Sequence, residues 1–94
     1  MYAINHLIKE TLKACKGSPK RSAAFARTLI LVKKRFSDAE ETIAFAHSEN
    51  VPKLKDHDIL KFLENEGAFS KTEAIKKIRE QLKVIERILE ELEQ

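Results

Sequence analysis

The sequence predicts a small all-α protein, a bundle of about five helices with a longer amphipathic helix at the carboxyl end. The chain has 94 residues, which is the usual length of one domain. Its residues are 43% hydrophobic and 35% charged, a mixture too apolar for a disordered chain. Only two glycines and two prolines interrupt it, too few turn residues for an all-β fold.

The first two helices are predicted by apolar spacing and by the residues that separate them. Apolar residues recur three and four apart over residues 2–16, and Gly17 ends this helix. Ser18 is a predicted N-cap with Pro19 in the first helical position, where the missing N–H costs nothing. The second helix is apolar nearly all round over residues 23–32, so we expect it to form the core.

Two further short helices are predicted in the middle of the chain. Ser37 and Glu40 have the spacing of a capping box, which predicts a third helix up to about Ser48. Pro52 and the polar residues before it predict a turn. Asp56 or Asp58 can cap a fourth helix, and Gly67 has the position of a left-handed C-terminal residue.

A fifth helix is predicted from Lys71 to the end, after a second capping box formed by Ser70 and Glu73. Isoleucine or leucine occupies each a and d position of its heptads, at Ile75, Ile78, Leu82, Ile85, Leu89 and Leu92. We therefore expect one helical domain over residues 1–94, in which 1–70 form the bundle and 71–94 form a coiled-coil-like association helix.

The charge pattern of this last helix favours an antiparallel homodimer. Residues 71–83 carry five cations and two acids, whereas residues 84–94 carry one cation and four acids. This order opposes the helix dipole, but it brings opposite charges together in an antiparallel pair. The predicted dimer interface combines the six seam residues with Arg79, which we expect to lie near Glu86 of the second chain. In the alternative, the same stripe packs on helices of its own chain.

The overall charge is +3, but it is distributed unevenly. Residues 1–36 hold nine cations and one acid, whereas residues 37–70 hold three cations and eight acids. Such a basic surface is typical of nucleic-acid binding that depends on salt and has low sequence selectivity. The predicted contacts are exposed cations at two helix ends, Lys13, Lys16, Lys20, Arg21, Lys33, Lys34 and Arg35.

Three other interpretations of the same residues remain open. The basic and acidic thirds can neutralise each other within a chain or across a dimer. The protein can instead be an adaptor or inhibitor that binds a partner protein through Val84, Ile88 and the acidic middle third. A DNA-reading helix-turn-helix over residues 42–50 and 58–65 is disfavoured, because its second helix would bring acids toward phosphate.

The residue types needed for catalysis and metal binding are sparse. The three histidines, His6, His47 and His57, and the single Cys15 have no metal-ligand spacing, and the chain has no glycine-rich phosphate loop. We therefore expect a regulatory protein that is not an enzyme and needs no cofactor or metal. No apolar run is long enough to cross a membrane, and a lone cysteine fits a cytoplasmic location.

Overall fold

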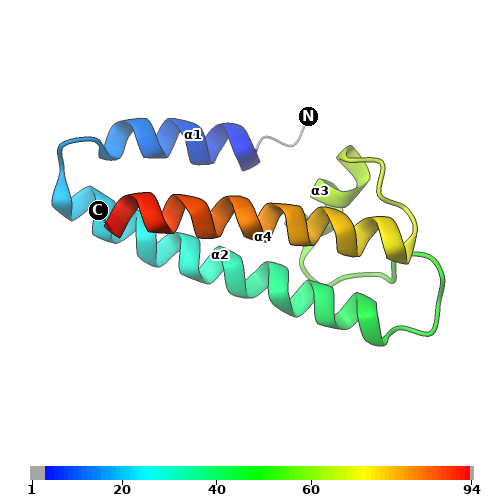
Figure 1. The fold of residues 1–94 in the computed structure, drawn as a ribbon. Helices are drawn as coiled ribbons and strands as arrows, with labels where there is room; N and C mark the ends of the chain where they lie inside the picture. The colour runs from blue at the N-terminus through cyan, green and yellow to red at the C-terminus, as the bar shows by residue number, and fades with distance from the viewer. Residues whose placement is uncertain (1–3, 94) are drawn as a thin grey trace.

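The computed structural model describes the backbone of residues 4–93 and the side chains of residues 9–92, and this part of the chain forms four α-helices (Figure 1). They are α1 (Ile4–Cys15), α2 (Pro19–Phe45), α3 (His57–Asn65) and α4 (Lys71–Glu93). Helices α2 and α4 run antiparallel along each other, and α1 and α3 lie at opposite ends of one edge of this pair (Figure 1). The all-α prediction is confirmed, whereas Tyr2 of the expected first helix lies outside the described residues.

The prediction of five helices is wrong, because the expected second and third helices form one continuous α2. Ser37 lies inside this helix, and its predicted role as an N-cap is not seen. A serine inside a helix costs only about 0.5 kcal/mol relative to alanine, and no glycine or proline interrupts residues 20–45. The buried residues continue across this point at helical spacing, at Phe25, Leu29, Phe36, Ala39 and Ile43. Burial of one long stripe therefore outweighs the local capping signal.

The predicted N-caps and glycine ends are confirmed, because local chemistry determines them, whereas the helix end expected at about Ser48 lies at Phe45. The side chains of Ser18, Asp56 and Ser70 each accept a hydrogen bond from the backbone N–H three residues later, at 3.2–3.4 Å. Gly17 and Gly67 have φ angles of 80° and 69°, the left-handed conformation that ends a helix at little cost only for glycine.

The core lies in the seam between α2 and α4, and α3 closes one end of it. The most deeply buried large side chains come from these three helices, namely Leu29, Phe36, Ile43, Leu63, Ile78 and Ile85. The rings of Phe36 and Phe62 meet edge to face, with 5.4 Å between their centres, and join α2 to α3. The expectation that residues 23–32 form the core is met only in part, since Phe25 and Leu29 are buried whereas Ile30 and Leu31 are exposed.

Backbone hydrogen bonds tie the loop after α2 to the turn before α4. The Val51 N–H donates to the Phe69 carbonyl at 3.2 Å, and the Lys71 N–H donates to the Glu49 carbonyl at 2.9 Å. The Lys71 ammonium also donates to the Ala46 carbonyl at 2.8 Å, just past the end of α2, where the helix dipole favours a cation. These contacts fix the end of α2 beside the start of α4.

Candidate nucleic-acid interface

Four of the predicted contacts gather at one end of the molecule. Lys13 lies in the last turn of α1, Lys16 follows its last residue, and Lys20 and Arg21 lie in the first turn of α2. All four residues are exposed, and none of them forms an ion pair with another residue of the described part. Arg21 Nη1 donates only to a backbone carbonyl, that of Ala14, at 3.4 Å. We call these four cations the turn cluster.

Arg35 is the most tightly paired of the remaining three predicted contacts. Its Nε and Nη2 donate to the two carboxylate oxygens of Asp56 at 2.7 Å, and Nη2 also donates to Asp58 at 3.0 Å. The hydrogen bonds from Arg35 hold the pKa of the Asp56 carboxyl below its usual range, against the opposite effect of burial. Arg35 therefore joins α2 to the start of α3, and its charge is already neutralised.

Lys33 and Lys34 are also paired, although more loosely. Lys33 Nζ lies 3.4 Å from Glu86 of α4, and Lys34 Nζ lies 3.8 Å from Asp38 one turn further along α2. Exposed pairs of this kind contribute only about 0–1 kcal/mol each. The predicted basic surface is thus divided: the turn cluster is available to anions, whereas residues 33–35 face acids of the same chain.

The predicted seam of α4 is only partly buried against its own chain. Ile78 and Ile85 are fully buried, whereas Ile75, Leu82, Leu89 and Leu92 are half-buried. The centre of the buried face is rotated toward a neighbouring row, formed by Ala74, Ile78, Gln81, Ile85 and Ile88. The apolar stripe of α4 is wider than the area that one helix covers. Helix α2 therefore buries one edge of the stripe and leaves the other edge half-exposed.

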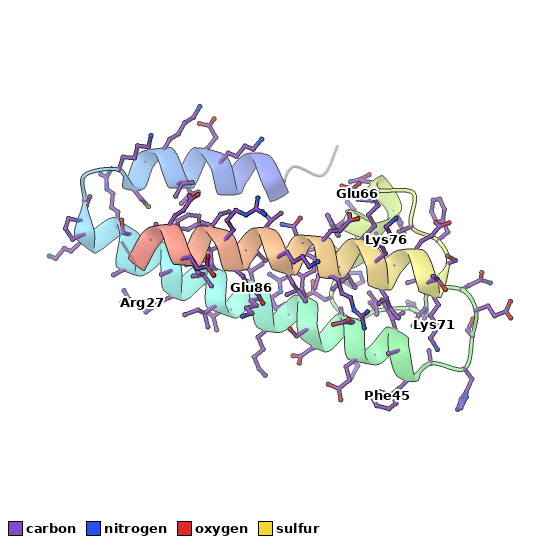
Figure 2. The ribbon with its side chains drawn as sticks, in the orientation of Figure 1. Arg27, Phe45, Glu66, Lys71, Lys76 and Glu86 are labelled. Carbon is purple, nitrogen blue, oxygen red and sulfur yellow. The ribbon has the colours of Figure 1, made fainter. Side chains whose placement is uncertain are left out.

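The two charged residues of the predicted seam have partners within the chain. Arg79 Nε donates to Glu40 Oε1 at 2.6 Å, and Glu86 pairs with Lys33. Figure 2 shows Glu86 at the seam between α4 and α2, on the side away from α1 and α3. Both pairs connect α4 to α2 across this side.

An open apolar hollow lies on that same side, and the sequence analysis missed it. It has a volume of about 620 Å³, and its apolar lining includes Ala23, Ala26, Ile30, Leu89 and Leu92. Ile30 is 55% exposed there. The available signal was the spacing of Ala23, Ala26 and Ile30, which forms a row of its own beside the buried Phe25 and Leu29.

Of the residues expected at an adaptor surface, Ile88 alone is buried among those of α4, and the acids Glu41, Glu49, Asp58, Glu64 and Glu66 of the middle third are exposed. Val84 is 41% exposed, but Ile88 is buried in the core and is not available to a partner. The helix-turn-helix is also absent, because α2 ends at Phe45 and residues 46–56 are not helical.

The search for metal and membrane sites gives no candidate in the described part of the chain. No group of three or more His, Cys, Asp or Glu side chains is placed there to hold a metal ion, and the His6 side chain lies outside this part. Cys15 is a buried free thiol. Among the described residues, no helix has the length and apolar character required to cross a membrane.

Comparison with known proteins adds no relative: no protein-family model, curated protein or solved structure matches this chain. Its function is therefore inferred from its own residues.

Proposed function

We propose that this protein is a non-catalytic, regulatory nucleic-acid-binding protein that contacts phosphates through the turn cluster. The observation that supports this function is that four exposed cations, without an ion-pair partner among the described residues, gather around the tight turn between α1 and α2, at Lys13, Lys16, Lys20 and Arg21. Lysine and arginine at such positions bind phosphate and release its counterions. Lys33, Lys34 and Arg35 are left out of the proposed surface because acids of the same chain face them.

The small size of the cluster defines the kind of binding. Each phosphate contact contributes a slope of about −0.9 to the dependence of log affinity on log salt, so four contacts give about −3.6 at most. Contacts to phosphate carry no information about base sequence. Helix α3, the second helix of the disfavoured helix-turn-helix, carries Asp58 and Glu64 on its surface. We therefore expect weak binding with little sequence preference.

A salt titration tests this function. The affinity for a duplex of about 30 base pairs is measured by fluorescence anisotropy from about 20 to 200 mM salt. The wild-type protein is expected to bind at low salt with a slope between about −2 and −3.6. The variant K13E/K16E/K20E is expected to lose binding, while K53E/K55E/K61E carries the same charge change at exposed lysines elsewhere and is expected to retain it.

Two results would contradict this function. One is the absence of a salt-sensitive signal at the lowest ionic strength. The other is an equal loss of affinity in the two variants, which would show that only net charge matters and that the turn cluster is not the contact surface. Far-ultraviolet circular dichroism of both variants verifies that they keep the helical fold.

A second candidate function is the binding of a partner protein, and the observation in its favour is the open hollow between α2 and α4. Apolar hollows with exposed aliphatic rims are typical of protein interaction sites. Under this function, Ile30→Glu abolishes partner binding, whereas K13E/K16E/K20E leaves it unchanged.

A further inference from the structure

One side of the α2–α4 pair has no helix packed on it in the described part of the chain, and we call it the open face. Arg35 of α2 and Lys77 of α4 form ion pairs with the residues that flank α3. Both side chains extend from the side of the helix pair opposite the open face. The residues of the open face are exposed or half-buried, and they are Ala26, Ile30, Lys33, Ser37 and Glu40 of α2 with Ile75, Arg79, Leu82, Glu86 and Leu89 of α4. The hollow forms one end of this face.

We propose that a second copy of this chain packs on the open face, with its α2 and α4 antiparallel to those of the first. The two-fold axis lies in the interface, perpendicular to the helices, and crosses α2 at Ser37 and α4 at Leu82. This inference goes beyond the nucleic-acid function and does not depend on it.

The apolar row of α4 on the open face is self-complementary in this arrangement. Ile75, Leu82 and Leu89 are seven residues apart, lie on one side of α4, and are half-buried within one chain. Reversal of the helix about Leu82 sets Leu82 against its own copy. The same reversal sets Ile75 against Leu89 at both ends. Each copy thus covers the apolar area that the other leaves exposed.

The ion pairs within the chain show which residue of α2 lies at the level of Leu82. Lys33 is paired with Glu86, and Glu40 is paired with Arg79. These two ion pairs connect the antiparallel helices α2 and α4 at two successive levels. The level midway between the two ion pairs is that of Ser37 on α2 and of Leu82 on α4. Ser37 is small and exposed, and therefore allows the two α2 helices to approach closely at the axis.

The four charged residues of these two ion pairs lie around the axis, with cations and acids alternating. Lys33 and Glu86 lie on one side of it, and Glu40 and Arg79 lie on the other. A two-fold rotation brings Lys33 next to Glu40 of the second copy and Arg79 next to Glu86 of the second copy. Opposite charges therefore meet across the interface in this arrangement, and apolar burial stabilises it.

The size of the open face suits a stable dimer. Helix α4 has 23 residues, and at about 1.5 Å per residue it is about 34 Å long. Two helices side by side present a width of about 20 Å, which gives about 700 Å² per copy, close to the roughly 800 Å² per partner of a standard interface. In this register Ile75 of the second copy lies against Leu89, at the rim of the hollow.

Sedimentation equilibrium of the full chain tests the oligomeric state over roughly 5 to 200 µM. We expect a species of twice the monomer mass of 10.8 kDa at the upper concentrations. Leu82→Glu is expected to weaken dimerisation at least 50-fold, because it places two carboxylates at the axis. Val84→Glu is the matched control, since Val84 lies on the same helix but outside the open face and is exposed. A wild-type protein that remains monomeric throughout overturns the proposal and leaves the open face to a different protein.

Two further experiments test the register without removing an apolar side chain. Ser37→Cys is expected to form a disulfide-linked dimer under mild oxidation, whereas Thr42→Cys, on another exposed side of α2, is not. Arg79→Glu and Glu86→Arg are each expected to weaken the homodimer, while their mixture restores a heterodimer. A dimer in which Ser37→Cys fails to cross-link, or whose mixture shows no preference for the heterodimer, overturns the assigned interface. Neither result affects the nucleic-acid titration, so the two proposals fail separately.

Discussion

Arg35 and Asp56 form a bidentate ion pair between α2 and the residue that precedes α3. Two nitrogens of the Arg35 guanidinium donate to the two oxygens of Asp56, both at 2.7 Å. Asp56 also accepts the Ile59 N–H at 3.3 Å as the N-cap of α3. One carboxylate therefore caps α3 and attaches it to α2. A cation that the sequence assigns to a nucleic-acid surface is part of the fold.

Replacement of Asp56 tests this double role. Asp56→Ala removes the cap and the paired hydrogen bonds together, and is expected to lower the free energy of unfolding by about 1–2 kcal/mol. Asp58→Ala removes only the single, more exposed contact at 3.0 Å and is expected to cost less. Urea denaturation followed by circular dichroism measures both. Equal losses would contradict the assigned cap.

The same carboxylate predicts a specific dependence of stability on pH. The hydrogen bonds from Arg35 lower the pKa of Asp56 in the folded protein, whereas in the unfolded chain this pKa has its ordinary value of about 3.8. The stabilisation is therefore complete above the unfolded pKa and is lost as the pH falls through the folded pKa. Thermal unfolding from about pH 6 to pH 2 is expected to show a smaller decline in Asp56→Asn than in the wild type. Parallel declines would show that Asp56 does not contribute.

Gln81 is a polar side chain inside the α2–α4 seam. It is buried, and its Nε2 has no hydrogen-bond partner among the described residues. A buried donor without a partner costs roughly 1–3 kcal/mol, so Gln81→Leu is expected to raise the free energy of unfolding by about 1 kcal/mol. Gln81→Glu is expected to lower it, because a carboxylate is harder to bury. Urea denaturation distinguishes the two, and a destabilised leucine variant would show that the amide has a structural role.

The position of the seam on α4 is tested by truncation of two neighbouring aliphatic residues. Ile85 is fully buried against its own chain, whereas Val84 is 41% exposed. Ile85→Ala is expected to lower the free energy of unfolding by about 2–5 kcal/mol, and Val84→Ala by less than about 1 kcal/mol. If both variants lose the same stability at low protein concentration, where the monomer dominates, the buried row is assigned incorrectly.

The helix ends could be predicted from the sequence because they depend on neighbouring residues. Ser18 with Pro19, Asp56, and Ser70 lie within three residues of the backbone groups that they cap. Local chemistry at Ser37 predicts a cap in the same way, but there the burial of Phe36 and Ala39 in one continuous helix stabilises the alternative. A capping signal of about 1 kcal/mol is weaker than the free energy gained by burying the Phe36 and Ala39 side chains in one continuous helix.

The turn cluster was predictable for the same reason, since Lys13, Lys16, Lys20 and Arg21 are close in the sequence. The pairing of Lys33 and Arg35 with acids could not be predicted, because Glu86 and Asp56 are brought to them only by the packing of α4 and α3 on α2.

The sequence by itself determined that the chain is helical, where most of its helices begin and end, and which residues carry charge. The tertiary structure alone decided which edge of the α4 stripe is covered. Within the described part of the chain, it also decided which cations retain no ion-pair partner and that one face of the α2–α4 pair is open. Helix formation and capping involve residues within one turn of each other, whereas burial and ion pairing join residues far apart in the chain, whose proximity depends on how all the helices pack.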